Sequence, residues 1–198
     1  MQVYRKEMPA IINCIVLAAG CSSRFGTTKL LAKIGDESMI RRVVKSVSSS
    51  RVSSVYVVAG HDAARVSQEI IDLCDGIVVN SEYRSGMGSS IASGINSLPA
   101  NSDGALIVLG DQPLVSPANF DALIEAWSKK RSHAVLSRHA GVLSPPSLFP
   151  RSMFPRLESL RGDVGARSSL GVGEYEVVEF DSAWPLTDID TREDLKKL

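Results

Sequence analysis

Short apolar runs alternate with segments of helical spacing over the first 130 residues of the chain. Four runs have the apolar character of strands buried in a parallel sheet, at residues 11–17, 54–59, 77–79 and 105–109. Between and after them, apolar side chains recur at helical intervals in residues 39–47, 63–71, 89–97 and 117–127. This alternation predicts an α/β fold with a doubly wound, mainly parallel, Rossmann-like sheet.

The pattern is less regular in residues 133–180. This segment contains Pro145, Pro146, Pro150 and Pro155. Because proline lacks a backbone N–H, we expect these residues to limit helix and interior strand here, and we expect a half-exposed strand at 174–180. Thr191 is expected to cap a last short helix, with Asp194 three residues further on. With no repeat and no clear linker, residues 1–198 are predicted to form a single domain.

The segment that follows the first strand carries the clearest chemical signal. Residues 17–30 read LAAGCSSRFGTTKL. Its glycines allow backbone N–H groups to approach a ligand closely, and Ser22 and Ser23 add short hydrogen-bonding side chains. Arg24 and Lys29 add positive charge, so the segment suits a polyphosphate.

Two common phosphate-binding loops are excluded by spacing. A P-loop places Gly-Lys-Ser/Thr four residues after its first glycine, whereas here five residues separate Gly20 from Gly26 and Thr27 follows. A dinucleotide fingerprint requires a second glycine where this chain has Ser22. The loop therefore belongs to another class of phosphate site.

A carboxylate follows another predicted strand. Asp111 comes directly after the run at 105–109, in the sequence Gly-Asp-Gln-Pro. Ligands of open α/β sheets bind beyond the carboxyl ends of the strands, where the loop at 17–30 also begins. Asp111 could hold Mg²⁺ beside a triphosphate, because this cation takes oxygen ligands and bridges phosphates. The alternative is an aspartate that only forms a turn.

Composition narrows the class of protein. The 198 residues are 44% hydrophobic and 22% charged, with a formal net charge of zero, so a general electrostatic case for nucleic-acid binding is absent. No run reaches the length of a membrane span, so no membrane partner is expected. Cys14, Cys21 and Cys74 form no C-x-x-C pair. A sparse, odd set of cysteines favours a reducing compartment, and the cytoplasm is the expected location.

The segment at 17–30 resembles the signature of the MobA-like nucleotidyltransferases, L-A-A-G-x-S-x-R-[MF]-G-x-x-K-L. Within that family the chain is most similar to the molybdenum cofactor cytidylyltransferases, which transfer CMP from CTP to molybdopterin and release pyrophosphate. The resemblance implies a fold of the nucleotide-diphospho-sugar transferase type and an Mg²⁺-dependent enzyme. It implies CTP and molybdopterin as substrates, and a molybdoenzyme or its chaperone as a partner.

The resemblance extends to three further motifs. They are Gly-Asp-Gln-Pro at 110–113, Gly-Asp-Val-Gly-Ala-Arg at 162–167 and Asp-Ile-Asp-Thr-Arg-Glu-Asp-Leu at 188–195. The last has Arg192 where the family usually has proline. A fourth segment, residues 80–94, resembles the loop with which the family recognises base and sugar. One departure is Ser-Pro-Pro at 144–146, near which many members of this branch have Gly-His-Pro.

Roles follow from these matches. The resemblance implies catalytic roles for Arg24, Lys29 and Asp111. It implies that the nucleotide is bound by Leu17, Ala18, Ala19, Gly20, Ser22, Ser23, Gly86 and Ser90. It implies that Mg²⁺ is held by Asp111 and Asp190, with Asp188 as the second choice for the latter. It implies that the acceptor is bound by Gly162, Asp163 and Arg167, whose guanidinium could pair with a phosphate.

The sequence leaves alternatives for the identity of the nucleotide base and of the acceptor. In this family L-A-A-G tends to accompany CTP and L-A-G-G tends to accompany GTP, so Ala19 favours CTP. A sugar phosphate or polyol phosphate could replace molybdopterin as acceptor, and guanylyl transfer from GTP is a further alternative. An alternative from another functional class is a non-catalytic protein that binds the molybdenum cofactor. Turnover that depends on Asp111 would distinguish an enzyme from such a binder.

Overall fold

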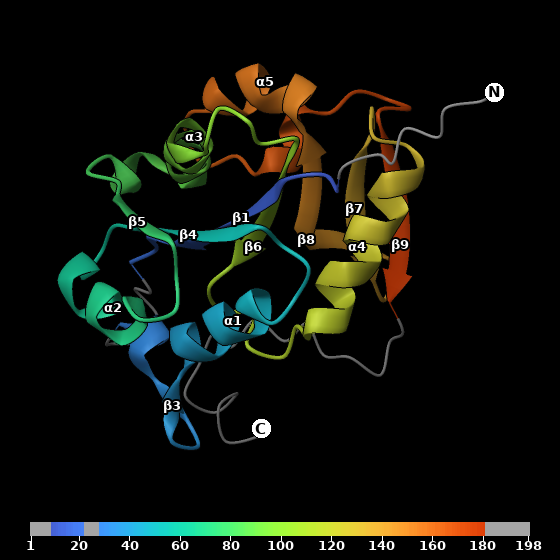
Figure 1. Ribbon diagram of the computed structural model, residues 1–198. Helices are drawn as coiled ribbons and strands as arrows, with labels where there is room; N and C mark the ends of the chain where they lie inside the picture. Colours follow the sequence, from blue (N-terminus) through green and yellow to red (C-terminus); the bar gives the residue numbers. More distant parts are fainter. Residues whose placement is uncertain (1–8, 22–27, 181–198) are drawn as a thin grey trace.

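A seven-stranded sheet forms the centre of the protein in a computed structural model, which describes residues 9–21 and 28–180 (Figure 1). In spatial order the strands are β5 (Gly76–Val79), β4 (Ser54–Ala59), β1 (Ile12–Ala18), β6 (Gly104–Leu109), β8 (Val142–Pro150), β7 (Ala134–His139) and β9 (Tyr175–Phe180). The first four are parallel to one another, and β8 is antiparallel to both of its neighbours. A small hairpin of β2 (Lys33–Ile34) and β3 (Glu37–Ser38) stands outside this sheet.

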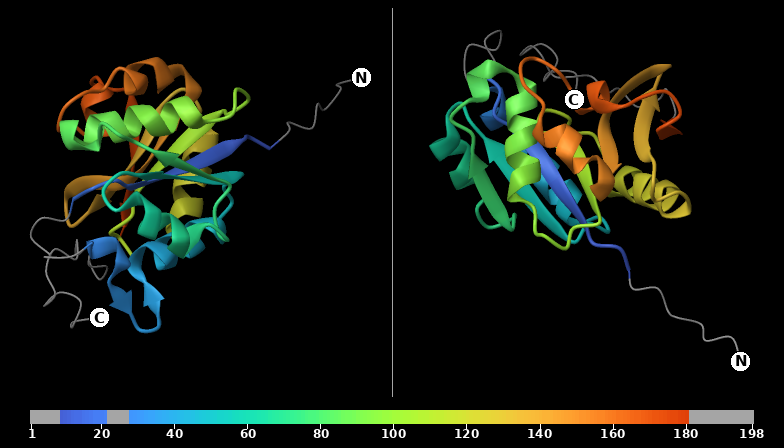
Figure 2. Two further views of the ribbon diagram at one scale, coloured as in Figure 1. Left: turned by 90° about the vertical axis from the view of Figure 1, so that its left-hand side faces the viewer. Right: turned by 90° about the horizontal axis from the view of Figure 1, so that it is seen from above.

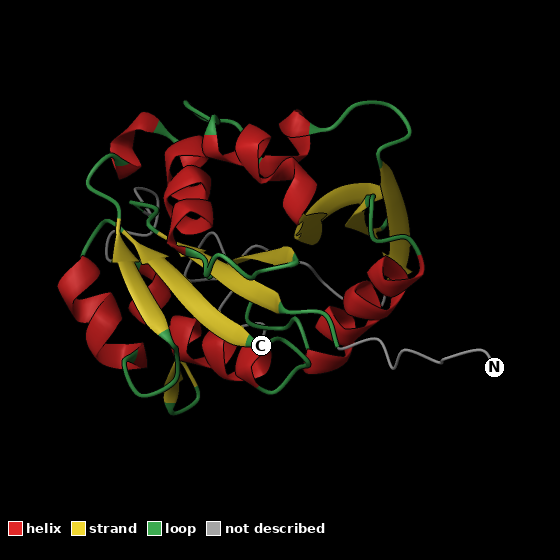
Figure 3. Cartoon of the chain, turned by 45° about the horizontal axis from the view of Figure 1, so that its top comes forward, coloured by secondary structure: helices red, strands yellow, loops and turns green. Residues whose placement is uncertain are grey.

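Helices cover both faces of the sheet, as two further views and the cartoon show (Figures 2 and 3). One face is covered by α1 (Met39–Ser48), α2 (Ala63–Ile70) and α4 (Pro117–Lys129). The other is covered by α3 (Met87–Ser97) and α5 (Phe154–Glu158). Successive side chains of β1 point to opposite faces, so Cys14 and Val16 join the first core while Ile15 and Leu17 join the second. The predicted doubly wound α/β fold is confirmed.

The prolines limit interior strand in 133–180 less than expected, because β8 lies between β6 and β7. Its hydrogen-bond ladder with β7 shifts register between Leu136 and Ser137. Pro145 and Pro146 have no partner in the ladder on either side, so neither is required to donate an N–H. Pro150 is the last residue of the strand. The irregularity thus accommodates two prolines inside a sheet.

The parallel strands end at one edge of the sheet, and this edge carries the predicted chemistry. Leu17 of β1 pairs with Leu109 of β6, so the turn after β1 lies beside the Gly110–Asp111 turn. A backbone hydrogen bond of 2.9 Å from Gly110 N to Leu17 O joins the two turns. In the described part of the chain, no helix has the length and apolar character needed to cross a membrane.

Candidate active site

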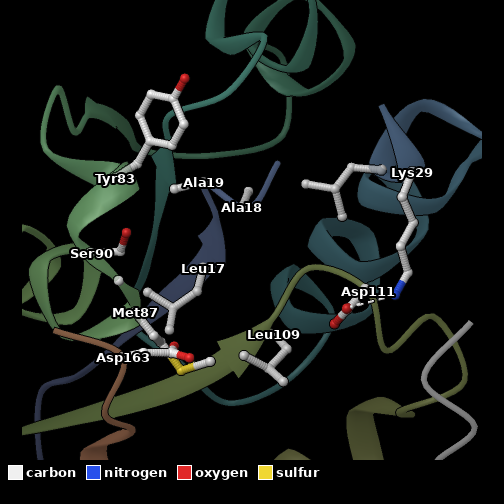
Figure 4. Close-up of a pocket in the computed structure, with 13 residues that line it drawn as sticks. Leu17, Ala18, Ala19, Lys29, Tyr83, Met87, Ser90, Leu109, Asp111 and Asp163 are labelled. Carbon is white, nitrogen blue, oxygen red and sulfur yellow. Dashed lines mark hydrogen bonds and ion pairs between the residues drawn. The ribbon is translucent and has the colours of Figure 1, made fainter. Parts of the chain in front are cut away.

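A cleft of about 310 Å³ opens at this edge of the sheet (Figure 4). It is lined by every described residue that the sequence assigns to catalysis or nucleotide binding: Leu17, Ala18, Ala19, Gly20, Lys29, Gly86, Ser90 and Asp111. These residues come from the turn after β1, the short helix η1 (Lys29–Leu31), the start of α3 and the turn after β6. The fold therefore assembles one site from segments that are far apart in sequence.

Lys29 and Asp111 form an ion pair on one side of the cleft. The ammonium Nζ lies 2.9 Å from Asp111 Oδ2, and the two side chains are 7% and 29% exposed. Burying a lysine is costly unless its charge is compensated, and the carboxylate provides that compensation. The pairing was not foreseen from the sequence, which assigned the two residues separate roles. It places one cation and one oxygen ligand side by side.

The opposite side of the cleft is formed by Tyr83, Ser90 and Asp163 (Figure 4). The Asn80 side chain connects α3 to the loop before it. Its Nδ2 donates to Ser90 Oγ at 3.0 Å, and its Oδ1 accepts from Glu82 N at 2.9 Å. Asn80 is itself buried. Among the described residues that line the cleft, this side contributes no lysine or arginine and does contribute the Asp163 carboxylate, so it suits a nucleoside better than a triphosphate.

The loop before α3 contacts the predicted acceptor element backbone to backbone. Gly86 has a φ of +114°, and a Cβ there would lie 2.2 Å from the carbonyl carbon of Gly162. Gly88 N donates to Gly162 O at 3.0 Å. Of the predicted acceptor residues, Gly162 is thus packed against the nucleotide loop, and Asp163 lines the cleft itself. The helix α3 begins at Met87, two residues earlier than predicted.

A second cavity of about 280 Å³ adjoins the first. Leu17, Met87, Leu109 and Asp163 line both. The rest of its wall is mostly aliphatic, from Ile91, Ile107, Leu136, Leu143, Pro145 and Ala166, with the polar groups of Ser144, Ser147 and Arg167 among them. Asp163 and Arg167, which the sequence assigned to acceptor binding, both border this cavity.

Several predicted residues lie outside the described part of the chain. They are Ser22, Ser23, Arg24, Asp188, Asp190 and the expected helix cap at Thr191. Within residues 9–21 and 28–180, no cluster of three or more His, Cys, Asp or Glu side chains could by itself hold a metal. Asp111 nevertheless fits Mg²⁺, since this ion is commonly held by one or two carboxylates together with substrate phosphates.

Some residues of the site carried no sequence signal. Tyr83 and Met87 line the cleft and lie in the segment 80–94, but the sequence singled out only Gly86 and Ser90 there, and Leu109 was only the end of a predicted strand. Gly60 is another case: a Cβ there would lie 2.7 Å from Tyr83 Cβ and 2.8 Å from Ala19 Cβ. A glycine one residue past a strand predicts a turn, but it does not reveal which side chains approach it.

Comparison with known proteins identifies relatives over nearly the whole chain. The model of the MobA-like NTP transferase domain matches residues 14–177. The purine catabolism protein PucB of Bacillus subtilis is 31% identical over 191 residues, covering 91% of this chain and 92% of that protein. The molybdenum cofactor cytidylyltransferase of Escherichia coli is 23% identical, covering 92% and 93%. The crystal structure of Rv0371c from Mycobacterium tuberculosis superposes with a TM-score of 0.81 at 26% identity, covering 96% and 97%.

Proposed function

Because the chain belongs to the family of MobA-like NTP transferase domains, we propose that it transfers CMP from CTP to molybdopterin and releases pyrophosphate. The family supports nucleotidyl transfer in general. The choice of CTP rests on Ala19 and on the cytidylyltransferase relative, and the choice of molybdopterin rests on that relative and on the second cavity. PucB is named for purine catabolism and does not decide the acceptor.

The observation that carries the proposal is the charge distribution along the cleft. Lys29 and its partner Asp111 lie on one side, and Tyr83, Ser90 and Asp163 lie on the other (Figure 4). Lys29 is the cation among the described lining residues, which favours the anionic triphosphate on its side and the uncharged base on the other. The triphosphate would lie at Lys29, and the base would lie toward Tyr83 and Ala19.

The reaction requires positioning and charge neutralisation. An ionised phosphate oxygen of the acceptor attacks the α-phosphorus in line, the bond from this phosphorus to the bridging oxygen breaks, and pyrophosphate leaves with the electron pair. Lys29 is suited to neutralise the charge that develops on the departing group. Asp111 would hold Mg²⁺, which would supply positive charge to the phosphates. Because the nucleophile is already ionised, no protein base is needed.

The acceptor would occupy the second cavity. Its aliphatic wall suits the face of a flat ring better than a sugar or polyol, whose hydroxyl groups require many polar partners. Arg167 at its border provides a planar donor for a phosphate. Leu17, Met87, Leu109 and Asp163, which are common to both cavities, would place the two substrates in contact.

The test is a pyrophosphate-release assay with Mg²⁺ and a matrix of substrates. CTP and GTP are each combined with molybdopterin, a sugar 1-phosphate and a polyol phosphate. We expect turnover with CTP and molybdopterin, and at least about tenfold lower kcat/KM with GTP. Turnover with GTP alone would overturn the base assignment. Turnover with a sugar phosphate alone would overturn the acceptor assignment and keep nucleotidyl transfer.

A further inference from the structure

The turn after β4 contacts the chain on both sides of the segment 22–27. Before that segment, Ala19 O accepts a hydrogen bond of 3.2 Å from His61 N. After it, Thr28 Oγ1 donates to Asp62 Oδ2 at 2.6 Å. Thr28 is buried, and it directly precedes Lys29. One short turn therefore holds the chain at two points that are nine residues apart in sequence.

Asp62 has an unusual conformation for its place in the fold. It precedes α2 in the N-cap position with φ +55° and ψ +33°, the left-handed region, whereas N-cap residues are typically extended. Its side chain makes no capping hydrogen bond to the helix. The carboxylate is directed at Thr28 instead, and Arg65 contacts the same oxygen at 2.9 Å. A conformation of this kind persists where the surrounding structure requires it.

The hydrogen bond between Asp62 and Thr28 is connected to Lys29 through the backbone. Thr28 O accepts from Leu31 N at 3.0 Å, which begins the turn of η1 that carries Lys29. The Lys29 ammonium then reaches Asp111 at 2.9 Å. Fixing Thr28 therefore fixes the backbone from which Lys29 enters the cleft.

We propose that Asp62 is a positioning residue, which sets the place of Lys29 in the cleft through its hydrogen bond with Thr28. The inference rests on the proposed nucleotidyl transfer, in which Lys29 neutralises charge that develops in the transition state. Arg65 offsets the negative charge of Asp62, so that this carboxylate does not repel a nearby triphosphate. Losing the contact should lower kcat more than it raises KM for CTP, because the interaction of Lys29 strengthens in the transition state.

The experiment compares variants of the two partners. Thr28→Val removes the donor and keeps the shape, and Thr28→Ser restores the hydroxyl. Asp62→Gly removes the carboxylate without adding left-handed strain. We expect kcat to fall about 10- to 100-fold in Thr28→Val and Asp62→Gly, as for a displaced catalytic group, and to recover in Thr28→Ser. The double variant should lose little more than either single variant, because both remove the same hydrogen bond.

Asp72→Ala is the matched control, because Asp72, just past the C-terminal end of α2, also accepts from an arginine, Arg41 of α1. It should leave kcat unchanged. The wild type is assayed first with whichever NTP and acceptor it turns over, so failure of the CTP and molybdopterin assignment is seen before any variant is made. Unchanged kcat in Thr28→Val, or equal loss in Thr28→Val and Thr28→Ser, would overturn the positioning role. Thermal melts show whether each variant is folded.

Discussion

The two halves of the sheet differ in the direction of their strands and in the cavities that they border. In residues 12–111 four parallel strands end at one edge, and their turns bring Ala19, Lys29 and Asp111 together in a cleft that contains an ion pair. In residues 134–180 the sheet contains an antiparallel strand with a register shift, and the cavity beside it is mostly aliphatic. The first half contains the described residues that are assigned to nucleotidyl transfer. The second half lines much of the cavity in which an acceptor would bind.

The largest effect is expected in the first half, at the ion pair. Lys29→Met keeps most of the buried volume and removes the charge, so kcat should fall about 100- to 1,000-fold, as when one preorganised electrostatic donor is lost. Steady-state pyrophosphate release measures this loss. Lys33→Met, on the exposed β2–β3 hairpin, is the control and should keep wild-type activity. A fall in kcat of less than about threefold in Lys29→Met would show that Lys29 does not take part in the reaction.

The contact between the halves is tested next. Gly86→Ala would place a Cβ 2.2 Å from the Gly162 carbonyl carbon at a φ of +114°, so the nucleotide loop and the acceptor element should be forced apart. Gly35→Ala also stands at a positive φ, +63°, but its Cβ would have open space, whereas the φ of +114° and ψ of 173° at Gly86 are essentially restricted to glycine. We expect Gly86→Ala to melt at a lower temperature than Gly35→Ala and to raise KM for both substrates. An increase for CTP alone would show that the halves act independently.

A smaller effect is expected for a charge in the second half. Arg167→Ala should raise KM for the acceptor about tenfold, as expected for the loss of one charge-assisted contact, and leave KM for CTP unchanged. Arg131→Ala, which removes an arginine lying over Trp127 on the far side of the sheet, is the control. Titrating each substrate at saturating levels of the other measures both constants. A change in KM for CTP would assign Arg167 to the nucleotide instead.

The smallest effect concerns pH. Burial lowers the pKa of His139 below its usual 6.5, and its ring stacks on Phe180 with centroids 5.0 Å apart. The folded protein therefore favours the neutral ring, and this stabilisation is present above pH 6.5 and lost as the pH falls below it. Hydrogen exchange should show that protection of β7 and β9 falls more between pH 7.5 and 5.5 than protection of β1 and β6 does. His139→Phe should remove this pH dependence, whereas His133→Gln should keep it.

The sequence predicts the first half well because its signals are local. The strand expected at 105–109 is found at Gly104–Leu109, and the helix expected from Pro117 begins there. Strand β8 was missed because its prolines are tolerated only through a register shift with β7, which depends on contacts between strands. The contact of Thr28 with Asp62 spans 34 residues and has no motif, so only the fold reveals it.

The central claim is that the cleft binds the nucleotide phosphates through Lys29 and a metal through Asp111. A crystal structure with CTP and Mg²⁺ tests it most directly. We expect an Asp111 carboxylate oxygen about 2.1 Å from the metal, and Lys29 Nζ within hydrogen-bond distance of a phosphate oxygen. The base should lie beside Ala19 and Tyr83, with the second cavity open to an acceptor. CTP bound with the ion pair of 2.9 Å intact and the metal away from Asp111 would contradict the account.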